Sequence, residues 1–371
     1  MAEKVTITDV ARAAGVSRQT VSNTLNSPEV VREETRRHVL EVIERLGYRA
    51  NQAARQMRTG RSRLIAIRIE PDGDGISGSV LDRFLHGLTE TAAQEGYRIL
   101  LYTAADDRSE IATYEDLLGA YKPDAFVLTA THHDDLRTSW LLERGLPFVA
   151  FGRPWSDLPD ARHPWVDVDG AAGTEAATRH LLAAGHRRIG FIGWPPGSGV
   201  GDDRREGWAR ALAASQRGTD LTTSQQGATL AASQQGTDLA AFRQGPDAAA
   251  SQQGAALGGL QRAVEDGIAA GESAARDLLA ADPELTALVC ASDSLALGAL
   301  QAREPGRPVA VIGFDDTPAA KAVGLTSVNQ PLAEAAAACV ELLARALESP
   351  DAEPPSTHVL LPPSLIIRQS A

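Results

Sequence analysis

From Arg63 onward, short apolar segments of strand length alternate with longer amphipathic segments of helical length. The strand-like segments are LIAIRIE, YRILLYTA, DAFVLTA, PFVAFG, RIGFIGW, ALVCAS and VAVIGF. Segments such as VLDRFLHGLTETAAQEG and GAAGTEAATRHLLAAG lie between them. Strands that alternate with helices predict a parallel sheet covered on both faces. These units are too numerous for one small sheet, so the pattern favours a large α/β core.

Residues 6–26 show a different pattern, TITDVARAAGVSRQTVSNTLN, which predicts two short helices joined by a tight turn. Thr8 is expected to cap the first helix. Gly15 falls where a left-handed residue ends a helix, and Ser17 is placed to cap the second helix. The apolar face of the first helix is expected to consist of Val10, Ala13 and Ala14.

The second of these helices has an outer face built almost wholly from hydrogen-bonding side chains, because Val21 and Leu25 point inward. Arginine can bond guanine in the major groove, and glutamine and asparagine can bond adenine. We therefore expect base readout from Arg18, Gln19 and Asn23. Contacts to DNA phosphates are expected from Thr8, Ser17, Thr20, Ser22 and Asn26. The alternative is a helical hairpin whose polar face is only solvated.

Residues 33–46, EETRRHVLEVIERL, predict a third helix that closes a small core with the first two. Its apolar face is expected to consist of Val39, Leu40, Ile43 and Leu46. Residues 1–62 carry 11 Lys and Arg against 7 Asp and Glu, a net charge of +4, and the other residues carry 25 against 41, a net charge of −16. A small basic module on a large acidic body favours DNA binding confined to the N-terminal part.

Longer stretches follow these helices in a specific order. The first is EETRRHVLEVIERLGYRANQAARQMRTGRSRLIAI. It is followed by HLLAAGHRRIGFIG, RREGWARAL, ASDSLALGAL, VIGFDDTP, LTSVNQP and LLPPSLIIRQS. In these stretches and in residues 6–26 the whole chain, apart from one insertion, resembles the lactose-repressor/galactose-repressor (LacI/GalR) family of bacterial transcription factors.

This resemblance implies a small all-α helix-turn-helix head and an α/β core of two lobes with parallel sheets, similar to type I periplasmic binding proteins. The expected boundaries are 1–50 for the head, 51–62 for a hinge, 63–165 with 312–328 for the N-terminal lobe, and 166–311 with 329–371 for the C-terminal lobe. Crossovers between the lobes are expected near Val166, Ile312 and Asn329.

The segment ANQAARQMRTG at residues 50–60 is too weakly apolar to hold a helix alone. In the family this hinge becomes helical on operator DNA, pairs with its twin from the second subunit, and inserts an apolar side chain between base pairs in the minor groove. By the resemblance that side chain is Met57, where the family usually has Leu. Contacts beside it are expected from Asn51, Arg55 and Arg58. The alternative is a flexible linker whose charges serve solubility.

Polar side chains follow several strand-like segments, and ligands of α/β sheets bind outside the carboxyl ends of the strands. Arg153 follows PFVAFG, Arg204 lies in the loop after RIGFIGW, and Asp293 follows ALVCAS. The resemblance implies that these positions hold the effector, and two bidentate donors facing an acceptor suit a sugar. Further candidates are Asp74, Ser77, Ser79, Trp155, Trp165 and Trp194. The alternatives are ion pairs between the lobes for the charged residues and packing or rim positions for the tryptophans.

Residues 215–259 depart from the family pattern by repeating a nine-residue unit. The successive units are SQRGTDLTT, SQQGATLAA, SQQGTDLAA, FRQGPDAAA and SQQGAALGG. Calcium-binding β-helices need paired glycines and a fixed aspartate in every copy, which these units lack. Because Gln, Ala and Ser dominate, we expect a disordered or loosely structured surface loop and assign it no function.

Other chemistry is disfavoured by the sequence. We find no nucleophile elbow, paired carboxylates or metal ligands at working spacing, and therefore expect neither an enzyme nor a cofactor or metal. His132-His133-Asp134-Asp135 lacks a second group of ligands, so a solvated loop is expected. The run Gly197-Ser198-Gly199-Val200-Gly201 lacks the third glycine of a dinucleotide fingerprint.

The expected location of the protein follows from the absence of a long apolar segment. No apolar run reaches membrane-spanning length, and the start MAEKVTITDV has no apolar signal core. Cys290 and Cys339 lie in apolar segments and indicate reduced core thiols. We expect a cytoplasmic, nucleoid-associated protein without a membrane partner.

The head and the core predict a homodimeric, sequence-specific transcriptional regulator that binds a palindromic operator. A repressor is expected, whose affinity for DNA is controlled by a small-molecule effector, a sugar, bound between the lobes. The alternatives on the same scaffold are an effector-dependent activator and a cytoplasmic sugar-binding protein.

Overall fold

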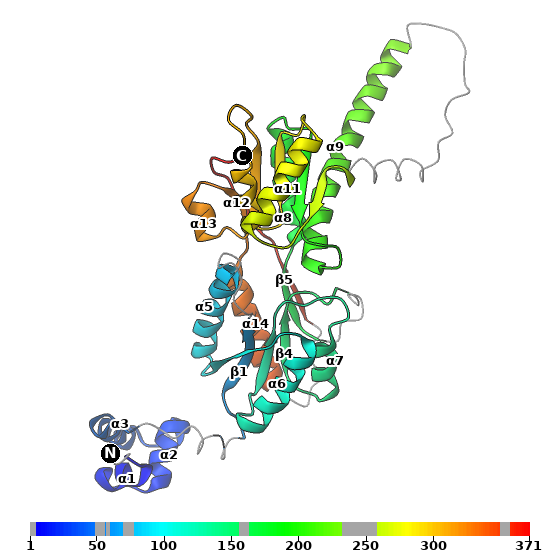
Figure 1. The fold of residues 1–371 in the computed structure, drawn as a ribbon. Helices are drawn as coiled ribbons and strands as arrows, with labels where there is room; N and C mark the ends of the chain where they lie inside the picture. Colours follow the sequence, from blue (N-terminus) through cyan, green and yellow to red (C-terminus); the bar gives the residue numbers. More distant parts are fainter. Residues whose placement is uncertain are drawn as a thin grey trace. The chain divides into compact units, whose positions relative to one another are not determined.

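The computed structural model describes residues 5–48, 56, 60–69, 78–155, 163–231, 258–348 and 357–371. The chain divides into two compact units, residues 1–63 and residues 64–371; the elements of both are labelled in Figure 1. The hinge candidates Asn51, Arg55, Met57 and Arg58 lie outside the described residues, as do the candidates Asp74 and Ser77.

The first unit contains α1 (Ile7–Ala14), α2 (Arg18–Asn26), the 3-10 turn η1 (Pro28–Val30) and α3 (Glu33–Leu46). Thr6, and not Thr8 as expected, caps α1, because Thr6 and Asp9 form a reciprocal capping box. Gly15 is left-handed with a φ of 66°, and the Ser17 side chain caps α2, both as expected. These two local signals fix the turn between the helices.

The core of the head confirms three helices packed together but corrects the apolar faces of two of them. Its buried residues are Val10, Ala11, Ala14, Val21, Val39 and Val42. Ala13 and Leu40, expected inside, are exposed. A helix repeats every 3.6 residues, so Val42 shares a face with Val39, whereas Leu40 points about 100° away from it.

The second unit contains a first sheet of six strands, all parallel. The strands are β1 (Leu64–Ile69), β2 (Arg98–Thr103), β3 (Ala125–Leu128), β4 (Phe148–Phe151), β5 (Trp165–Val168) and β11 (His358–Leu361). They lie in the order β11-β5-β4-β3-β1-β2. All four residues of β3 are buried, as expected for a strand covered on both faces.

Helices cover the two faces of this sheet. The helices are α5 (Gly78–Gln94), α6 (Asp107–Ala120), α7 (Leu136–Glu143) and α14 (Leu332–Glu348). Ile65 and Ile67 pack with side chains of α5 and α14, whereas Ala66 between them packs with side chains of α6 and α7. Successive strand residues point to opposite faces, so α5 and α14 cover one face and α6 and α7 the other.

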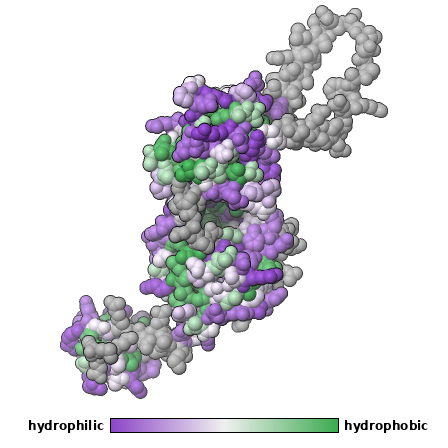
Figure 2. Space-filling view, in the orientation of Figure 1, coloured by the Kyte–Doolittle hydropathy of each residue, from purple (hydrophilic) through white to green (hydrophobic). Residues whose placement is uncertain are grey.

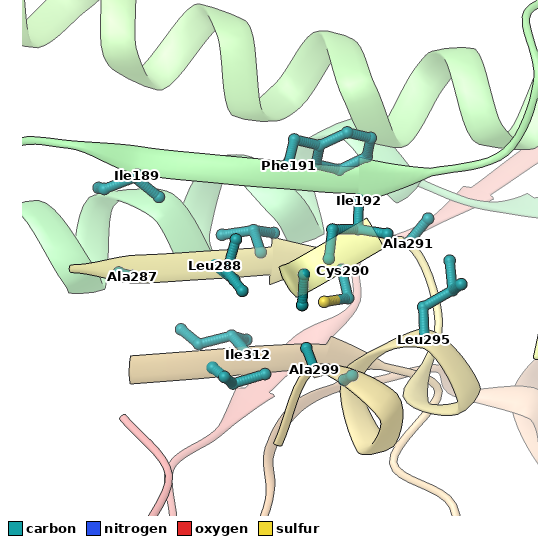
Figure 3. Packing of buried hydrophobic residues seen from close by; sticks show 14 of the residues in the cluster. Ile189, Phe191, Ile192, Ala287, Leu288, Cys290, Ala291, Leu295, Ala299 and Ile312 are labelled. Carbon is teal, nitrogen blue, oxygen red and sulfur yellow. The ribbon is translucent and has the colours of Figure 1, made fainter. Parts of the chain in front are cut away.

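The second sheet also has six strands, and only β12 is antiparallel to its neighbour. The strands are β6 (Ile189–Gly193), β7 (Gln261–Ala263), β8 (Ala287–Cys290), β9 (Ala310–Phe314), β10 (Thr326–Asn329) and β12 (Ser364–Ile366), in the order β12-β10-β9-β8-β6-β7. Its helices are α8 (Gly170–Ala183), α9 (Gly199–Ala231), α11 (Ile268–Ala281), α12 (Asp293–Gln301) and α13 (Pro318–Ala322). Figure 3 shows Ile189, Phe191, Leu288 and Cys290 in the core that these elements enclose.

The two sheets define the two expected lobes, but their boundaries differ from the expected ones. Residues 312–328 were expected in the N-terminal lobe, yet Ile312 pairs with Val289 of β8 and with Thr326 of β10 in the second sheet. The chain crosses after β5 and after β10, near Val166 and Asn329 as expected, but the third crossover lies between β11 and β12 and not near Ile312, so α14 and β11 belong to the first lobe. Buried parallel strands have similar sequences in either sheet, which is why lobe membership was mispredicted.

The repeat segment is helical where the structure describes it. Helix α9 extends from Gly199 to Ala231 and includes residues 215–231, which were expected to be disordered or loosely structured. Gln, Ala and Leu favour helices, so the repeats can prolong the helix that RREGWARAL begins. Residues 232–257 lie outside the described part of the chain. Among the described helices, none is both long enough and apolar enough to cross a bilayer.

Candidate functional site

The outer face of α2 presents the polar side chains expected to read DNA. Arg18, Gln19 and Asn26 are exposed, and Asn23 is half-buried. Gln19 Nε2 donates to Asn23 Oδ1 at 2.8 Å, so these two side chains hold each other in place. Asn26 Nδ2 donates to the Ser22 carbonyl oxygen at 2.6 Å. The helix therefore offers Arg18 and an amide pair on one side.

Two of the candidates for phosphate contacts, Ser17 and Thr20, lie at the N-terminus of the same helix. Ser17 Oγ accepts from the Thr20 backbone nitrogen at 3.0 Å, and Ser17 Oγ and Thr20 Oγ1 are 2.9 Å apart. Thr8 is exposed on the first turn of α1. A helix N-terminus with hydroxyl side chains is suited to a phosphate, because the helix dipole and the backbone N–H groups favour an anion there.

The core carries a cavity of about 530 Å³ between its two lobes. The first lobe contributes Val80, Leu81, Thr129, Ala130, Thr131, His132, Phe151, Gly152, Arg153, Trp155, Asp167 and Val168. The second lobe contributes Gly170, Trp194, Ser198, Gly199, Val200, Asp203 and Arg204, and Gln330 lies on a crossover. Figure 2 shows polar and apolar residues intermixed on the visible face and the surface hollowed between the lobes. Most of these residues follow strands, as expected for a ligand site of parallel sheets.

Arg153 lines this cavity but is engaged by two carboxylates. Its Nε donates to Asp167 Oδ2 at 2.6 Å, and its Nη2 donates to Asp203 Oδ2 at 2.7 Å. Burial alone would lower the pKa of Arg153, but the adjacent carboxylates of Asp167 and Asp203 raise it. Because Asp203 lies on α9, this ion pair joins the two lobes, which was the alternative interpretation of Arg153.

Arg204 lines the same cavity and is held mainly by aromatic rings. Its Cζ lies 3.7 Å from the ring centroid of Phe314 and 5.3 Å from that of Trp194. Its Nη1 donates to the Ala291 carbonyl oxygen at 2.5 Å and lies 3.6 Å from Asp315 Oδ1. The buried Nε of Arg204 has no hydrogen-bond partner among the described residues. This guanidinium therefore retains a donor for a ligand.

Two of the three candidate tryptophans line the cavity. Trp155 lies under Arg153, with 4.6 Å between the guanidinium carbon and the ring centroid. A Cβ at Gly199 would lie 2.2 Å from the Trp155 ring, so packing explains the glycine there. Trp194 Nε1 donates to Asp266 Oδ1 at 3.1 Å. Flat indole rings beside polar donors suit a ligand with both apolar faces and hydroxyls.

The structure does not place Trp165, Asp293 and Ser79 in the cavity lining. Trp165 begins β5 and stacks on His358, with 4.7 Å between ring centroids, at the amino end of the strand. Ser79 lies in the first turn of α5, next to the lining residues Val80 and Leu81. The sequence placed Trp165 in a loop after a strand, and this placement is wrong because Trp165 is part of β5 itself.

Asp293 is fully buried and supports the turn after β9. Its Oδ1 accepts from Ser327 Oγ at 2.6 Å, and its Oδ2 accepts from the Thr317 backbone nitrogen at 2.7 Å. Burial raises the pKa of Asp293, and the hydrogen bond from Ser327 opposes that rise. The sequence identified this residue as following a strand, but Ser292 caps α12 and Asp293 turns into the core as its first residue.

Carboxylates that the sequence analysis did not select are part of the site. Asp167 and Asp203 hold Arg153, and Asp315 lies behind Arg204 with its Oδ1 accepting from Gln330 Nε2 at 2.6 Å. Burial raises the pKa of Asp315, and Arg204 opposes that rise. The motif GFDDTP after a strand was a usable signal for Asp315, because it resembles the strand ends that gave Arg153 and Arg204.

His132, expected in a solvated loop, lines the cavity and contacts Asp107 with 3.0 Å between Nε2 and Oδ1. Asp107, His132 and Asp135 lie close enough together to hold a cation. However, the fully buried Arg137 already contacts both carboxylates, with its Nη2 2.6 Å from Asp135 Oδ2 and its Nε 3.5 Å from Asp107 Oδ1. The guanidinium balances these carboxylates, so the cluster gives no support for a metal.

A helix-turn-helix unit joined to a two-lobed core with a cavity at the strand ends is the architecture of a ligand-responsive DNA-binding protein. Three family models match the chain: "Bacterial regulatory proteins, lacI family" at residues 6–51, "Periplasmic binding proteins and sugar binding domain of LacI family" at 79–267, and "Periplasmic binding protein-like domain" at 178–371. The chain belongs to the LacI family of bacterial transcriptional regulators.

Individual relatives cover nearly the whole chain. The HTH-type transcriptional regulator CelR of Thermobifida fusca is 30% identical, over 98% of either chain. A regulatory protein of the LacI family from Chloroflexus aggregans is 34% identical with a TM-score of 0.66, covering 83% of this chain and 98% of its own. A transcriptional regulator CelR-cellobiose complex is 26% identical with a TM-score of 0.65, covering 99% of this chain and 100% of its own. This chain is thus a transcriptional regulator and not an enzyme.

Proposed function

We propose that this regulator is a homodimeric repressor that a sugar controls by binding in the cavity between the lobes. The observation that carries the proposal is Arg204, a buried guanidinium with an unused Nε donor between two aromatic rings in that cavity. A sugar offers hydroxyl acceptors to the guanidinium and apolar ring faces to the indoles of Trp155 and Trp194. A cavity of about 530 Å³ falls within the range of small-molecule sites.

Cellobiose is the first sugar to test. The similar CelR structure is a complex with cellobiose, and its likeness extends over 99% of this chain. The two arginines Arg153 and Arg204 balance the two carboxylates of Asp167 and Asp203 in the lining, which favours a neutral ligand over a strongly charged one.

On the DNA side, we propose base readout by Arg18, Gln19 and Asn23 and phosphate contacts by Thr8, Ser17, Thr20, Ser22 and Asn26. Two heads related by a two-fold axis would meet two half-sites, which requires a palindromic operator and a homodimer. For the hinge we propose minor-groove contacts by Asn51, Arg55, Met57 and Arg58. Such a protein acts at the nucleoid in the cytoplasm.

The proposed coupling follows from linkage. A sugar that prefers one arrangement of the lobes shifts their equilibrium, and it changes DNA affinity by the same factor by which DNA changes sugar affinity. Loss of operator binding on adding sugar defines an inducer of a repressor. Tighter binding on adding sugar defines a corepressor or an effector-dependent activator.

The experiment is selection of operators from randomised duplex DNA by the purified chain, with and without a panel of sugars that includes cellobiose. An enriched palindrome whose occupancy falls with one sugar supports the whole proposal. An enriched palindrome whose occupancy no sugar changes would contradict control by a sugar, but it would still support operator binding by the head. A variant with Arg18→Ala and Gln19→Ala is the matched control, because it should lose the enriched sequence while still binding the sugar.

A further inference from the structure

Arg83, on α5 of the first lobe, donates hydrogen bonds to four acceptors that lie in or next to the second lobe. Its Nη1 donates to the carbonyl oxygens of Asp315 at 2.9 Å and of Asp316 at 3.3 Å. Its Nη2 donates to Asn329 Oδ1 at 3.3 Å and to the Gln330 carbonyl oxygen at 3.4 Å. One guanidinium therefore holds the turn after β9 and the crossover from β10 to α14.

The turn that Arg83 holds has an unfavourable backbone. Asp315 has a φ of 109° and Asp316 a φ of 49°, values that residues with a side chain rarely adopt. Such a conformation persists only where the surroundings over-determine it. Within the second lobe, the Asp315 nitrogen donates to the Val328 carbonyl oxygen at 2.7 Å, and the Asp316 nitrogen donates to Ser327 Oγ at 3.0 Å. Arg83 supports the same turn from the first lobe.

The same turn contacts two side chains of the cavity lining. Gln330 Nε2 donates to Asp315 Oδ1, and Arg204 Nη1 lies 3.6 Å from the same oxygen. Gln330 and Arg204 both line the cavity, whereas Arg83 is not part of its lining. The turn therefore lies between Arg83 and two cavity side chains, so a shift of the turn moves both of them.

The ion pair between Arg153 and Asp203 is a contact between the lobes of a different kind. Arg153 and Asp203 both line the cavity, so a ligand that enters can compete for their hydrogen bonds. Three of the four acceptors of Arg83 belong to residues outside the lining, Asp315, Asp316 and Asn329, so a ligand in the cavity does not compete directly for these hydrogen bonds. The two contacts between the lobes therefore have different roles. The Arg153–Asp203 pair is exposed to a ligand in the cavity, whereas these three hydrogen bonds of Arg83 lie behind the cavity.

We propose that Arg83 is a positioning residue that fixes the angle between the two lobes and, through the Asp315–Asp316 turn, the placement of Arg204 and Gln330 in the cavity. The inference rests on the proposed function only in treating the cavity as a ligand site. The angle itself can be measured without sugar or DNA, so failure of this inference is distinguishable from failure of the proposed function.

The test measures the distance between spin labels on the two lobes of the ligand-free full chain. Asp116→Cys on α6 and Asp277→Cys on α11 place labels at exposed positions of the first and second lobe. Cys290 and Cys339 are buried, so they should not react with the label. Labelled chain is diluted into excess unlabelled chain, so that each assembly contains one labelled pair.

Arg83→Ala is expected to broaden the distribution of label distances about twofold, because the lobes lose their shared turn contact. Arg83→Lys should give a distribution of intermediate width, between those of the unchanged protein and Arg83→Ala, since one ammonium cannot reach all four acceptors. Arg345→Ala is the control and should leave the distribution unchanged, because Arg345 is an exposed arginine on α14 that among the described residues pairs with Glu341 of the same helix. A residue with a purely structural role would lower the melting temperature without widening the distribution below it.

An unchanged distribution in folded Arg83→Ala would overturn the proposal, and so would equal broadening in Arg345→Ala. If Arg83→Ala does not fold, Asn329→Ala replaces it, because this change removes one of the four acceptors. Asn329→Ala should broaden the distribution less than twofold, and no broadening there would also overturn the proposal.

Discussion

Two arginines in one cavity differ in what their guanidinium groups already contact. Arg153 donates hydrogen bonds to Asp167 and Asp203. Arg204 stacks on Phe314, and its buried Nε has no hydrogen-bond partner among the described residues. A ligand can use the Nε donor of Arg204 without breaking an existing ion pair, whereas at Arg153 it competes with Asp167 and Asp203. Sugar affinity should accordingly depend more on Arg204 than on Arg153.

Arg204→Lys should weaken sugar binding by about tenfold to a hundredfold, because a hydrogen bond from a charged donor contributes roughly 1.5–3 kcal/mol. The lysine keeps a positive charge near Asp315 but loses the planar group and the Nε donor. The measurement is calorimetric titration with the sugar that changes operator occupancy. Arg205→Lys is the matched control, because Arg205 is partly exposed and pairs with Asp202 at 3.1 Å. Equal affinities in the two variants would contradict the role of Arg204.

At the scale of elements, a buried carboxylate joins β1, α6 and α7 of the first lobe. Glu110 Oε2 accepts from Arg68 Nη1 at 2.8 Å and from Arg137 Nη1 at 2.9 Å. Its Oε1 accepts from the hydroxyls of Tyr102 at 2.8 Å and Tyr114 at 2.7 Å. Every acceptor position of this fully buried group is used, so the strand ends beneath the cavity are held together.

Glu110→Gln should lower the free energy of unfolding by about 3–5 kcal/mol, because it removes the charge that two buried arginines share. Urea unfolding followed by circular dichroism measures this change. Glu115→Gln on the same helix should have little effect, since Glu115 is exposed and its nearest cation, Arg144, is 4.0 Å away. Similar stabilities for the two variants would show that the carboxylate does not hold the elements together.

The turn after β9 should make stability depend on pH. Burial raises the pKa of Asp315 to about 7, above the value of about 3.9 for an unfolded aspartate. The stability linked to this group is fully present below the unfolded pKa and is lost as the pH rises through the folded pKa. The free energy of urea unfolding should therefore fall from about pH 4 to about pH 7, and Asp315→Asn should reduce that fall. Parallel pH profiles for the two proteins would exclude the effect.

Elements and their ends were predictable from local sequence, whereas several site residues were not. Gly15 and Ser17 act within one turn of the chain, so their roles follow from their neighbours. The burial of Asp293 behind the cavity depends on Thr317 and Ser327, which are distant in sequence. The sequence places a residue at a strand end but does not show whether it faces the ligand or the core.

At the scale of the molecule, opposite charges are divided between the two units. Residues 1–62 carry a net charge of +4 and the other residues −16. A negative body is expected to repel DNA, so we expect the phosphate contacts to be made by the head. This division of charge could be predicted from the sequence. The assignment of β9 to the second lobe could not, because the partners of a strand are set by contacts between residues far apart in the chain.

Operator binding should weaken by roughly 10³-fold or more when salt rises from about 50 mM to about 200 mM, as counterions compete for the phosphates. Fluorescence anisotropy on the selected operator gives the slope of log affinity against log salt. Arg18→Ala should weaken binding to the operator more than to random DNA, because Arg18 is proposed to contact a base. Arg187→Ala, an exposed change in the body, should alter neither quantity. A slope that changes with Arg187→Ala would place phosphate contacts on the body.

The positive φ values of Asp315 and Asp316 also bear on attempts to raise the thermal stability of this protein. Glycine would adopt these backbone angles at lower cost, so a selection for heat resistance should favour Gly at one of these positions. Yet Asp315 contacts Gln330 and lies beside Arg204, both in the cavity. A replacement of Asp315 would therefore change the surroundings of the proposed ligand site, and we expect stability gained there to weaken the response to the effector.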